Sequence, residues 1–266
     1  MTDPATPVHA QPPAWLSRIE DAGINASAPT EQRWVDGWLV RFNPGKAKRA
    51  RCVQAVAAGH LTLDERLAIC QRLFDTAGLP MVLRITPFSQ PEGLDEALAQ
   101  RGYALFEPTQ VMLARPCPHT PAAPWPDGVV LQQLSHAEFA QAVGELRGSP
   151  PSQRQAQAQR LAASPVPYQG WVLRRLTDHA VLACGQIAIE DDMVGLYDVF
   201  THPEARGQGL GTQLCQHLLS TAHAAGAQVA YLQVSADNHA ARAIYHRLGF
   251  TDAYSYHYRS LDPAAA

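Results

Sequence analysis

An internal repeat is the feature of this chain that most constrains its fold. Residues 63–113 and 210–259 share one order of expected elements: a helix that ends in Ala-Gly, an apolar strand, a loop, a second helix and a closing strand. The glycines that end these helices are Gly78 and Gly102 in the first segment and Gly226 and Gly249 in the second. Self-similarity over this length is typical of a duplicated unit. The alternative is a chance likeness between two generic α/β halves.

Chain length and proline content predict how the two copies are organised. A chain of 266 residues is long for one ordinary domain and comfortable for two of roughly 100 to 150 residues each. Prolines crowd the stretch PCPHTPAAPWPDG, which continues neither a helix nor a sheet. We therefore expect a disordered lead-in at 1–13, a first domain at 14–115, a proline-rich linker at 116–128 and a second domain at 129–266.

Composition and charge exclude several classes of partner. The apolar fraction of 46% and the charged fraction of 17% are those of a globular protein, and no apolar run is long enough to cross a bilayer. The N-terminus lacks the pattern of a secretory signal. The five cysteines are scattered without a CxxC pair, and the net charge is -3. We expect a cytoplasmic protein with reduced thiols and no metal, membrane or nucleic-acid partner.

Hydrophobic periodicity predicts a mixed α/β fold for the second half. The expected strands cover 129–134, 170–176, 180–189, 194–200, 229–234 and 254–259, and the expected helices cover 137–146, 152–163 and 238–248, with one more beginning near Thr212. The helix near Thr212 carries an apolar stripe at i, i+4 spacing, which is typical of a helix packed on a sheet.

A glycine-rich stretch, RGQGLG at 206–211, lies between the strand at 194–200 and the helix near Thr212. Three glycines let the backbone approach a ligand closely, and the helix N-terminus directs N–H groups toward it, so this turn is a candidate pyrophosphate site. A dinucleotide fold would need glycine at Thr212, and a Walker A loop would need a lysine. A glycine-rich loop without a ligand is the remaining alternative. The counterpart at 56–61, VAAGHL, has one glycine and no arginine, so the first copy is expected to lack a phosphate turn.

Three motifs in the second half resemble those of a known family. The RGQGLG turn, the helix with Asn238, Ala241 and Tyr245 at Asn-x-x-Ala-x-x-x-Tyr spacing, and the Leu-Gly-Phe ending at 248–250 are similar to the GCN5-related N-acetyltransferase (GNAT) superfamily. The resemblance covers 129–259, and it extends weakly over 34–114 as the degenerate N-terminal half of tandem members. It implies two tandem domains, each a mixed, mostly antiparallel central sheet flanked by helices. It also implies acetyl-CoA as co-substrate, an amine acceptor, no metal and one active site, in the second half.

The resemblance assigns acetyl-CoA contacts to the strand end, the glycine turn and the following helices. These residues are Val199, Phe200, Thr201, Arg206, Gly207, Gln208, Gly209, Leu210, Gly211, Thr212, Asn238, Ala241 and Tyr245. The N–H of Val199 would bind the thioester oxygen. Arg206 would support the pyrophosphate turn, and Asn238 would fix the pantetheine arm or cap its helix.

Two residues are candidates for proton transfer. Tyr245 is the candidate general acid, because a phenol with a pKa of about 10 stays protonated at neutral pH and can serve a departing thiol. The alternative is a tyrosine that packs in the core. Asp198 is the leading candidate for the general base, and a cap or an ion pair is its alternative. Strand alternation puts Tyr197 and Val199 on the face opposite Asp198 unless a bulge intervenes. Residues 190–192 are interpreted as a solvated hairpin tip, with Glu190 or a water relay as other routes for the proton.

The sequence does not identify the amine acceptor. Residues 147–163 and the first half are expected to choose it, and Trp34, Trp38 and Phe42 either line a cleft or fill the first core. We expect a small-molecule amine or amino acid, while a peptide N-terminus and a lysine side chain remain alternatives. From another functional class, a non-catalytic acyl-CoA sensor or interaction module also stays open, as does the choice between monomer and homodimer.

Overall fold

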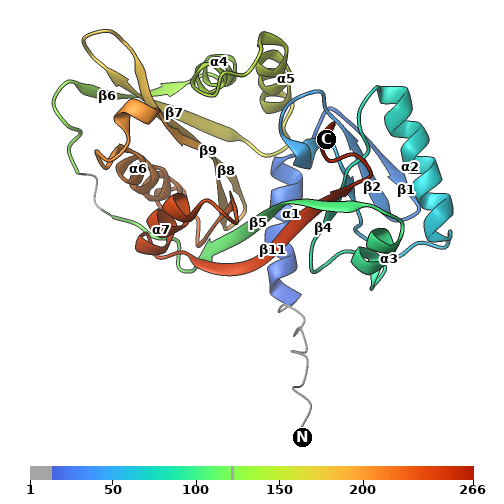
Figure 1. The fold of residues 1–266 in the computed structure, drawn as a ribbon. Coiled ribbons are helices and arrows are strands. Elements are labelled where there is room, and N and C mark those ends of the chain that lie inside the picture. The colour runs from blue at the N-terminus through green and yellow to red at the C-terminus, as the bar shows by residue number, and fades with distance from the viewer. Residues whose placement is uncertain (1–13, 121–122) are drawn as a thin grey trace, which may run out of the picture.

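A computed structural model describes residues 14–120 and 123–266, and all the strands in these residues join one eleven-stranded sheet. The strand order is β1-β2-β3-β4-β11-β5-β10-β9-β8-β7-β6. Helices flank this mixed, mostly antiparallel sheet (Figure 1). The predicted disordered lead-in at 1–13 lies outside the described residues, as do positions 121 and 122 of the predicted linker.

The first half supplies the strands on one side of the sheet. Its elements are α1 (Ser17–Ala26), β1 (Glu31–Val35), β2 (Trp38–Phe42), β3 (Val53–Gln54), α2 (Leu63–Ala77), β4 (Leu83–Ile85), α3 (Leu94–Gln100) and β5 (Ala104–Ala114). Helix α2 begins with a capping box, in which Thr62 and Glu65 satisfy each other's backbone N–H groups.

The second half follows the predicted order of elements. They are β6 (Val129–Leu134), α4 (His136–Leu146), α5 (Pro151–Ala162), β7 (Tyr168–Arg175), β8 (Val181–Glu190), β9 (Met193–Thr201), α6 (Leu210–Ala224), β10 (Val229–Ser235), α7 (His239–Arg247) and β11 (Thr251–Ser260). Helix α6 begins at Leu210, slightly before the expected Thr212, because Gly209 adopts a left-handed conformation and serves as its N-cap.

The repeat inferred from the sequence has a structural counterpart. In each half a strand pairs in parallel with the strand that follows the long helix: β3 with β4, and β9 with β10. The long helices are followed by glycines at positive φ, Gly78 at 65° and Gly226 at 99°. Gly102 and Gly249 follow the shorter helices in the same conformation. Both copies therefore use the same left-handed turns to leave their helices.

The two halves exchange their closing strands. Strand β5, from the first half, lies between β10 and β11 and pairs antiparallel with both. Strand β11, the last strand of the chain, pairs on its other side with β4 of the first half. Figure 1 shows β5 and β11 running side by side from one half into the other. The sheet is therefore continuous across the predicted linker, and the division into domains at 116–128 stays a prediction.

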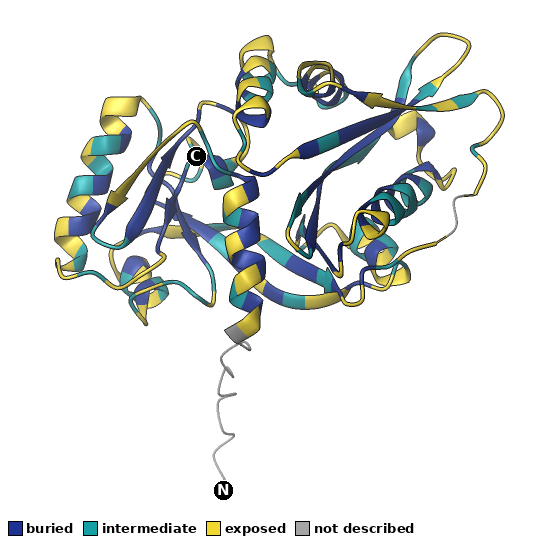
Figure 2. Ribbon diagram, turned by 180° about the vertical axis from the view of Figure 1, so that it is seen from behind, coloured by how far each residue is buried: buried dark blue, intermediate teal, exposed yellow. Residues whose placement is uncertain are grey.

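Buried residues lie mainly in the strands of the sheet, and exposed residues gather on the outer faces of the helices (Figure 2). Trp38 and Phe42 belong to the core of the first half, where Phe42 packs against Phe74 with ring centroids 5.4 Å apart. Trp34 is 65% exposed. Of the three aromatic residues considered for a cleft, two therefore fill the first core and one lies on the surface.

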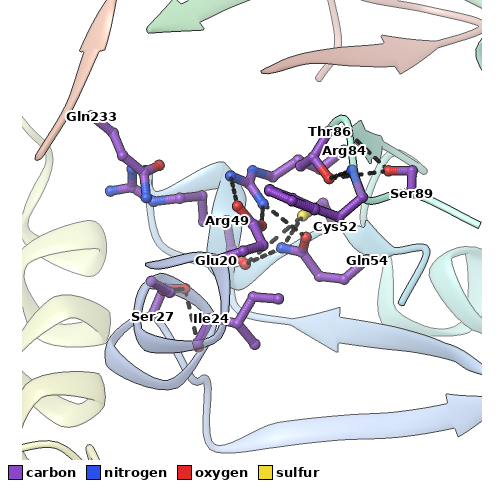
Figure 3. Close-up of polar contacts among 12 residues, drawn as sticks. Glu20, Ile24, Ser27, Arg49, Cys52, Gln54, Arg84, Thr86, Ser89 and Gln233 are labelled. Carbon is purple, nitrogen blue, oxygen red and sulfur yellow. Dashed lines mark hydrogen bonds and ion pairs between the residues drawn. The ribbon is translucent and has the colours of Figure 1, made fainter. Parts of the chain in front are cut away.

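A buried ion pair joins α1 to the exchanged strands. The Glu20 carboxylate of α1 accepts hydrogen bonds from Arg84 of β4 and, at 2.7 Å, from the hydroxyl of Tyr254 in β11. Figure 3 shows Arg84 beside Glu20. The Arg84 guanidinium lies 3.8 Å from the ring centroid of Tyr256. Burial works to raise the pKa of Glu20, but the charge and hydrogen bonds of Arg84 lower it below its ordinary value. The pair is therefore charged at neutral pH and ties three elements together.

Removing one partner of this pair is expected to destabilise the whole fold. We predict that Glu20→Gln lowers the free energy of unfolding by about 3–5 kcal/mol, because Arg84 keeps its buried charge without a counterion. Since the pKa of Glu20 is lower in the folded state, its contribution is present above the unfolded-state pKa and is lost as the pH falls. Urea unfolding measured at neutral and acidic pH tests both statements.

The matched control is Glu31→Gln, because Glu31 is exposed and its side chain pairs with the near neighbour Arg33 at 3.5 Å. An exposed pair of this kind contributes about 0–1 kcal/mol. Equal unfolding free energies for the two variants would contradict the structural role of Glu20.

Candidate active site

A groove of about 590 Å³ lies where β9 ends and α6 begins. Of the predicted acetyl-CoA contacts, every residue except Gln208 lines it. The groove is also lined by residues that the motifs did not indicate, namely Ala205, Cys215, Ala240, Ile244 and Arg247. These five residues lie close in sequence to the motif residues, on helical turns that line the same groove.

Each glycine of the turn answers a local geometric requirement. Gly207 and Gly209 have φ angles of 75° and 78°, in the left-handed region that disfavours side chains. A Cβ atom on Gly211 would lie 2.8 Å from Oγ1 of Thr201. The first turn of a helix leaves N–H groups without intrahelical partners. Leu210 and Thr212 line the groove beside Gly211, so this helix end suits an anionic ligand.

Arg206 ties the turn back to β9. Its Nε donates to the carbonyl oxygen of Thr201 at 3.2 Å, and its guanidinium lies 5.7 Å from the ring centroid of Phe200. Gln208 donates instead to the carbonyl oxygen of Glu204 at 3.3 Å. Arg206 therefore lines the groove at the strand end, whereas the Gln208 side chain bonds back along the chain.

A β-bulge in β9 separates two neighbouring side chains. Gln186 pairs with Tyr197 and Cys184 with Phe200, so two residues of β9 lie opposite the one residue between them on β8. Asp198 has a φ of 51° at this point. The bulge that the sequence analysis allowed for is therefore present, and Tyr197 and Val199 do not share a face because the extra residue breaks the alternation. Val199 lines the groove, while Tyr197 and Asp198 line a separate pocket.

Strand β9 also parts from its neighbour at the bulge. Parallel pairing between β9 and β10 runs from Met193 with Val229 to Leu196 with Leu232 and goes no further, although both strands continue. The β9 edge from Tyr197 onward is therefore open toward β10. An open strand edge presents backbone N–H and C=O groups that a ligand can bind.

Tyr245 lies on α7 with its side chain against the groove. The residue is 8% exposed, and its ring meets Phe250 edge to face with centroids 6.0 Å apart. Burial raises the pKa of Tyr245 above its ordinary value of 10.0, so its hydroxyl is protonated at neutral pH. Asn238 is the N-cap of α7 and accepts a hydrogen bond from the Ala241 N–H at 3.1 Å.

Asp198 is held by three side chains. Arg147 donates to Oδ1 at 2.7 Å, while Gln157 and Gln186 donate to Oδ2 at 2.9 and 2.7 Å. The ion pair considered as the alternative for Asp198 is thus present in the structure. These partners could not be predicted from a local motif, because they come from the end of α4, from α5 and from β8. The role of Asp198 as a base stays a prediction.

The acidic hairpin tip differs from the expectation. Asn25 donates to Glu190 at 2.8 Å and Arg18 pairs with Asp192 at 2.7 Å, so two of the three acidic residues contact α1. Asp191 alone of the three is exposed. The tip joins β8 to β9 at the end of β9 away from the bulge, and Glu190 therefore lies far along the strand from the groove.

The counterpart turn in the first half holds a carboxylate of the chain itself. The Asp36 side chain accepts hydrogen bonds from the N–H groups of His60 and Leu61 at 2.9 and 2.8 Å. These backbone hydrogen bonds lower the pKa of Asp36. A Cβ atom on Gly59 would lie 2.0 Å from the same carboxylate. The turn of the first copy is therefore closed by an internal anion, in agreement with the expected loss of its phosphate site.

Residues 14–120 and 123–266 contain no group of three or more His, Cys, Asp or Glu side chains arranged to hold a metal ion. None of the helices in these ranges is long and apolar enough to cross a membrane.

Comparison with known proteins agrees with this geometry. Residues 133–250 match the model of the Acetyltransferase (GNAT) family. The chain is 28% identical to the uncharacterized N-acetyltransferase YobR of Bacillus subtilis (strain 168) over 247 residues, covering 86% of this chain and 91% of that protein. The N-acetyltransferase relative thus matches both halves, not the second half alone.

Two solved structures share the fold. A GCN5-related N-acetyltransferase from Kribbella flavida has a TM-score of 0.67 at 17% identity and covers 93% of this chain and 95% of its own. A tandem GNAT protein from the clavulanic acid biosynthesis pathway has a TM-score of 0.59 at 16% identity, covering 76% of this chain and 70% of its own. The fold is that of two tandem GNAT-like units, as predicted. The second half of the chain matches the GNAT family over residues 133–250, and this match supports an N-acyltransferase activity.

Proposed function

We propose that this protein transfers an acetyl group from acetyl-CoA to the amine of a small molecule or amino acid, at one site in its second half. The observation that carries the proposal is the groove in which the glycine turn, the open edge of β9 and Tyr245 meet. In the reaction the amine nitrogen forms a bond to the thioester carbon, the carbon–sulfur bond breaks, and coenzyme A leaves as the thiol. The free thiols of all five cysteines and their burial are consistent with a cytoplasmic setting.

The proposed donor site uses backbone groups more than side chains. The pyrophosphate would lie at the N–H groups of Gly209 to Gly211, with Arg206 adding charge beside them. The pantetheine arm would then follow the open edge of β9, where the N–H of Val199 is the proposed donor to the thioester oxygen. Asn238, whose side-chain oxygen caps α7, keeps its amide N–H groups for the arm.

Tyr245 is the proposed general acid. A leaving thiolate needs a proton, and a phenol whose pKa is raised by burial delivers one without being ionised beforehand. Its hydroxyl borders the groove near the proposed path of the pantetheine arm. Burial of Tyr245 therefore both keeps its hydroxyl protonated and holds the side chain beside the groove.

Asp198 is the proposed base for the acceptor. It is the one carboxylate among the described residues that line the pocket on the far side of β9 from the groove. An amine there loses its proton as it attacks the carbonyl, and the Arg147 and glutamine contacts fix the carboxylate that would take this proton. The proton leaves the site through that carboxylate.

We predict that Gly209→Asp weakens acetyl-CoA binding at least tenfold, measured by calorimetry. The substitution places a side chain at a φ of 78° and a negative charge beside the pyrophosphate. Gly93→Asp is the matched control, because Gly93 has the same N-cap position on α3 and a φ of 76° in the first half. Unchanged affinity in Gly209→Asp, or an equal loss in the control, would contradict the proposed acetyl-CoA site at the glycine turn.

We predict that Tyr245→Phe lowers kcat at least about a hundredfold and leaves the Kd for acetyl-CoA within about twofold. Because the pKa of Tyr245 is raised, the wild-type rate should hold up to at least about pH 10 before the acid is lost. Tyr103→Phe is the control, since Tyr103 is an equally buried tyrosine in the core of the first half. An unchanged kcat in Tyr245→Phe would remove the acid from the mechanism.

We predict that Asp198→Asn lowers kcat/KM for the acceptor by about a hundredfold or more, because a neutral amide cannot take the proton of the attacking amine. The double variant Asp198→Asn with Arg147→Gln is the control, because it also removes the partly buried charge that the first substitution leaves unpaired. Recovery of activity in the double variant would assign Asp198 a structural role. Binding of acetyl-CoA without turnover of any amine would favour the acyl-CoA sensor.

A further inference from the structure

A second cavity, of about 250 Å³, lies between the two halves of the chain. The first half contributes residues around the loop that follows β2, and the second half contributes α4, α5, β7 and β9. The inference drawn from this cavity rests on the proposed acetyltransferase function and concerns which amines that function accepts.

The cavity and the groove meet back to back across β9. Tyr197 and Asp198 line the cavity, whereas Val199 and Phe200 line the groove. The bulge produces this division, and β9 has already parted from β10 at these residues. An amine held in the cavity therefore faces the segment of β9 along which the thioester is proposed to lie.

The walls of the cavity carry an excess of positive charge. Four basic side chains line it, from Lys46, Arg49, Arg147 and Arg160, against the single carboxylate of Asp198. That carboxylate is already paired with Arg147 at 2.7 Å. Among residues 14–120 and 123–266, no ion pair involves the other three basic residues.

The contacts of the remaining arginines are neutral. Arg160 is 7% exposed and donates to the backbone carbonyl of Ala26 at 3.2 Å. Arg49 donates to the side-chain oxygen of Gln233 (Figure 3), and its guanidinium lies 5.7 Å from the ring centroid of Tyr197. Cations that are withdrawn from water without a counterion are costly, and a bound anion would offset that cost.

We infer that the acceptor is a small amine that also bears an anionic group, a carboxylate, which Arg49, Arg160 and Lys46 bind while the amine lies at the β9 bulge beside Asp198. Arginine binds carboxylate and phosphate by the same forked geometry, so the shared chemistry is an oxyanion. The size of the cavity fits an amino acid, and both halves of the chain are needed to build it.

Matched acceptors test the charge requirement. The acceptors are an ω-amino carboxylate, its neutral amide and the aminoalkyl phosphate with an alkyl chain of the same length. Each is assayed for release of coenzyme A. We expect kcat/KM for the carboxylates to exceed that for the amides at least tenfold. A higher rate with the phosphates would support the oxyanion and assign it to phosphate. Equal rates for the amides and the anions would overturn the inference while leaving the acetyltransferase proposal standing.

A pair of variants tests the residues. Arg49→Gln removes the charge and should raise KM for the carboxylates at least tenfold, with the amides changed less than twofold. Lys48→Gln is the matched control, because Lys48 lies one residue away and pairs with Glu107 at 2.7 Å outside the cavity. Lys46→Gln is the second test variant, and since Lys46 is exposed it should fold normally.

Binding gives a readout that does not need turnover. Calorimetric titration with an N-acetylated amino acid, the expected product, should show binding to the wild type and a loss of at least tenfold in Arg49→Gln. If no amine of either class is acetylated, the proposed function fails, and this titration still decides whether the cavity binds a carboxylate. Absence of binding, or equal affinity in the two proteins, would overturn the inference.

Discussion

The exchange of closing strands is the constraint on which the rest of the structure depends. Strand β5 of the first half completes the pairing of β10, and β11 of the second half completes that of β4. Neither half therefore completes the strand pairing of its own part of the sheet. The buried pair of Glu20 and Arg84 lies where this exchange brings α1, β4 and β11 together. The hydrogen bonds of the sheet and the buried charges thus hold the two halves in one relative position.

The exchange also shapes the site. Strand β10 pairs with β5 along Ala230 to Ser235, while β9 stays paired with β8 up to Thr201. Because each strand follows a different partner, β9 and β10 separate beyond Leu196 and Leu232. The bulge at Asp198 then directs neighbouring side chains to opposite sides of the opening. The groove on one side of β9 and the cavity on the other both lie at this divergence of two strands.

Local signals in the sequence predicted much of this arrangement. The glycine turn, the Asn238 cap and the position of Tyr245 depend on residues close together in the chain, and the structure places all of them along one groove. The strand exchange was not predictable, since a strand pattern does not say which strand will be its partner. The bulge gave no signal either, because its left-handed residue is an aspartate and not a glycine. The partners of Asp198 come from three separate elements, and no motif connects them.

The two copies of the turn differ in where their negative charge comes from. In the first copy Asp36 supplies it permanently, within the same polypeptide, at the N–H groups of His60 and Leu61. The turn of the first half is therefore closed whatever the concentration of metabolites around it. In the second copy the corresponding helix end faces a groove, so any stabilisation by an anion there depends on supply from solution. A duplicated element is in this way closed by its own chain in one copy and open to solution in the other.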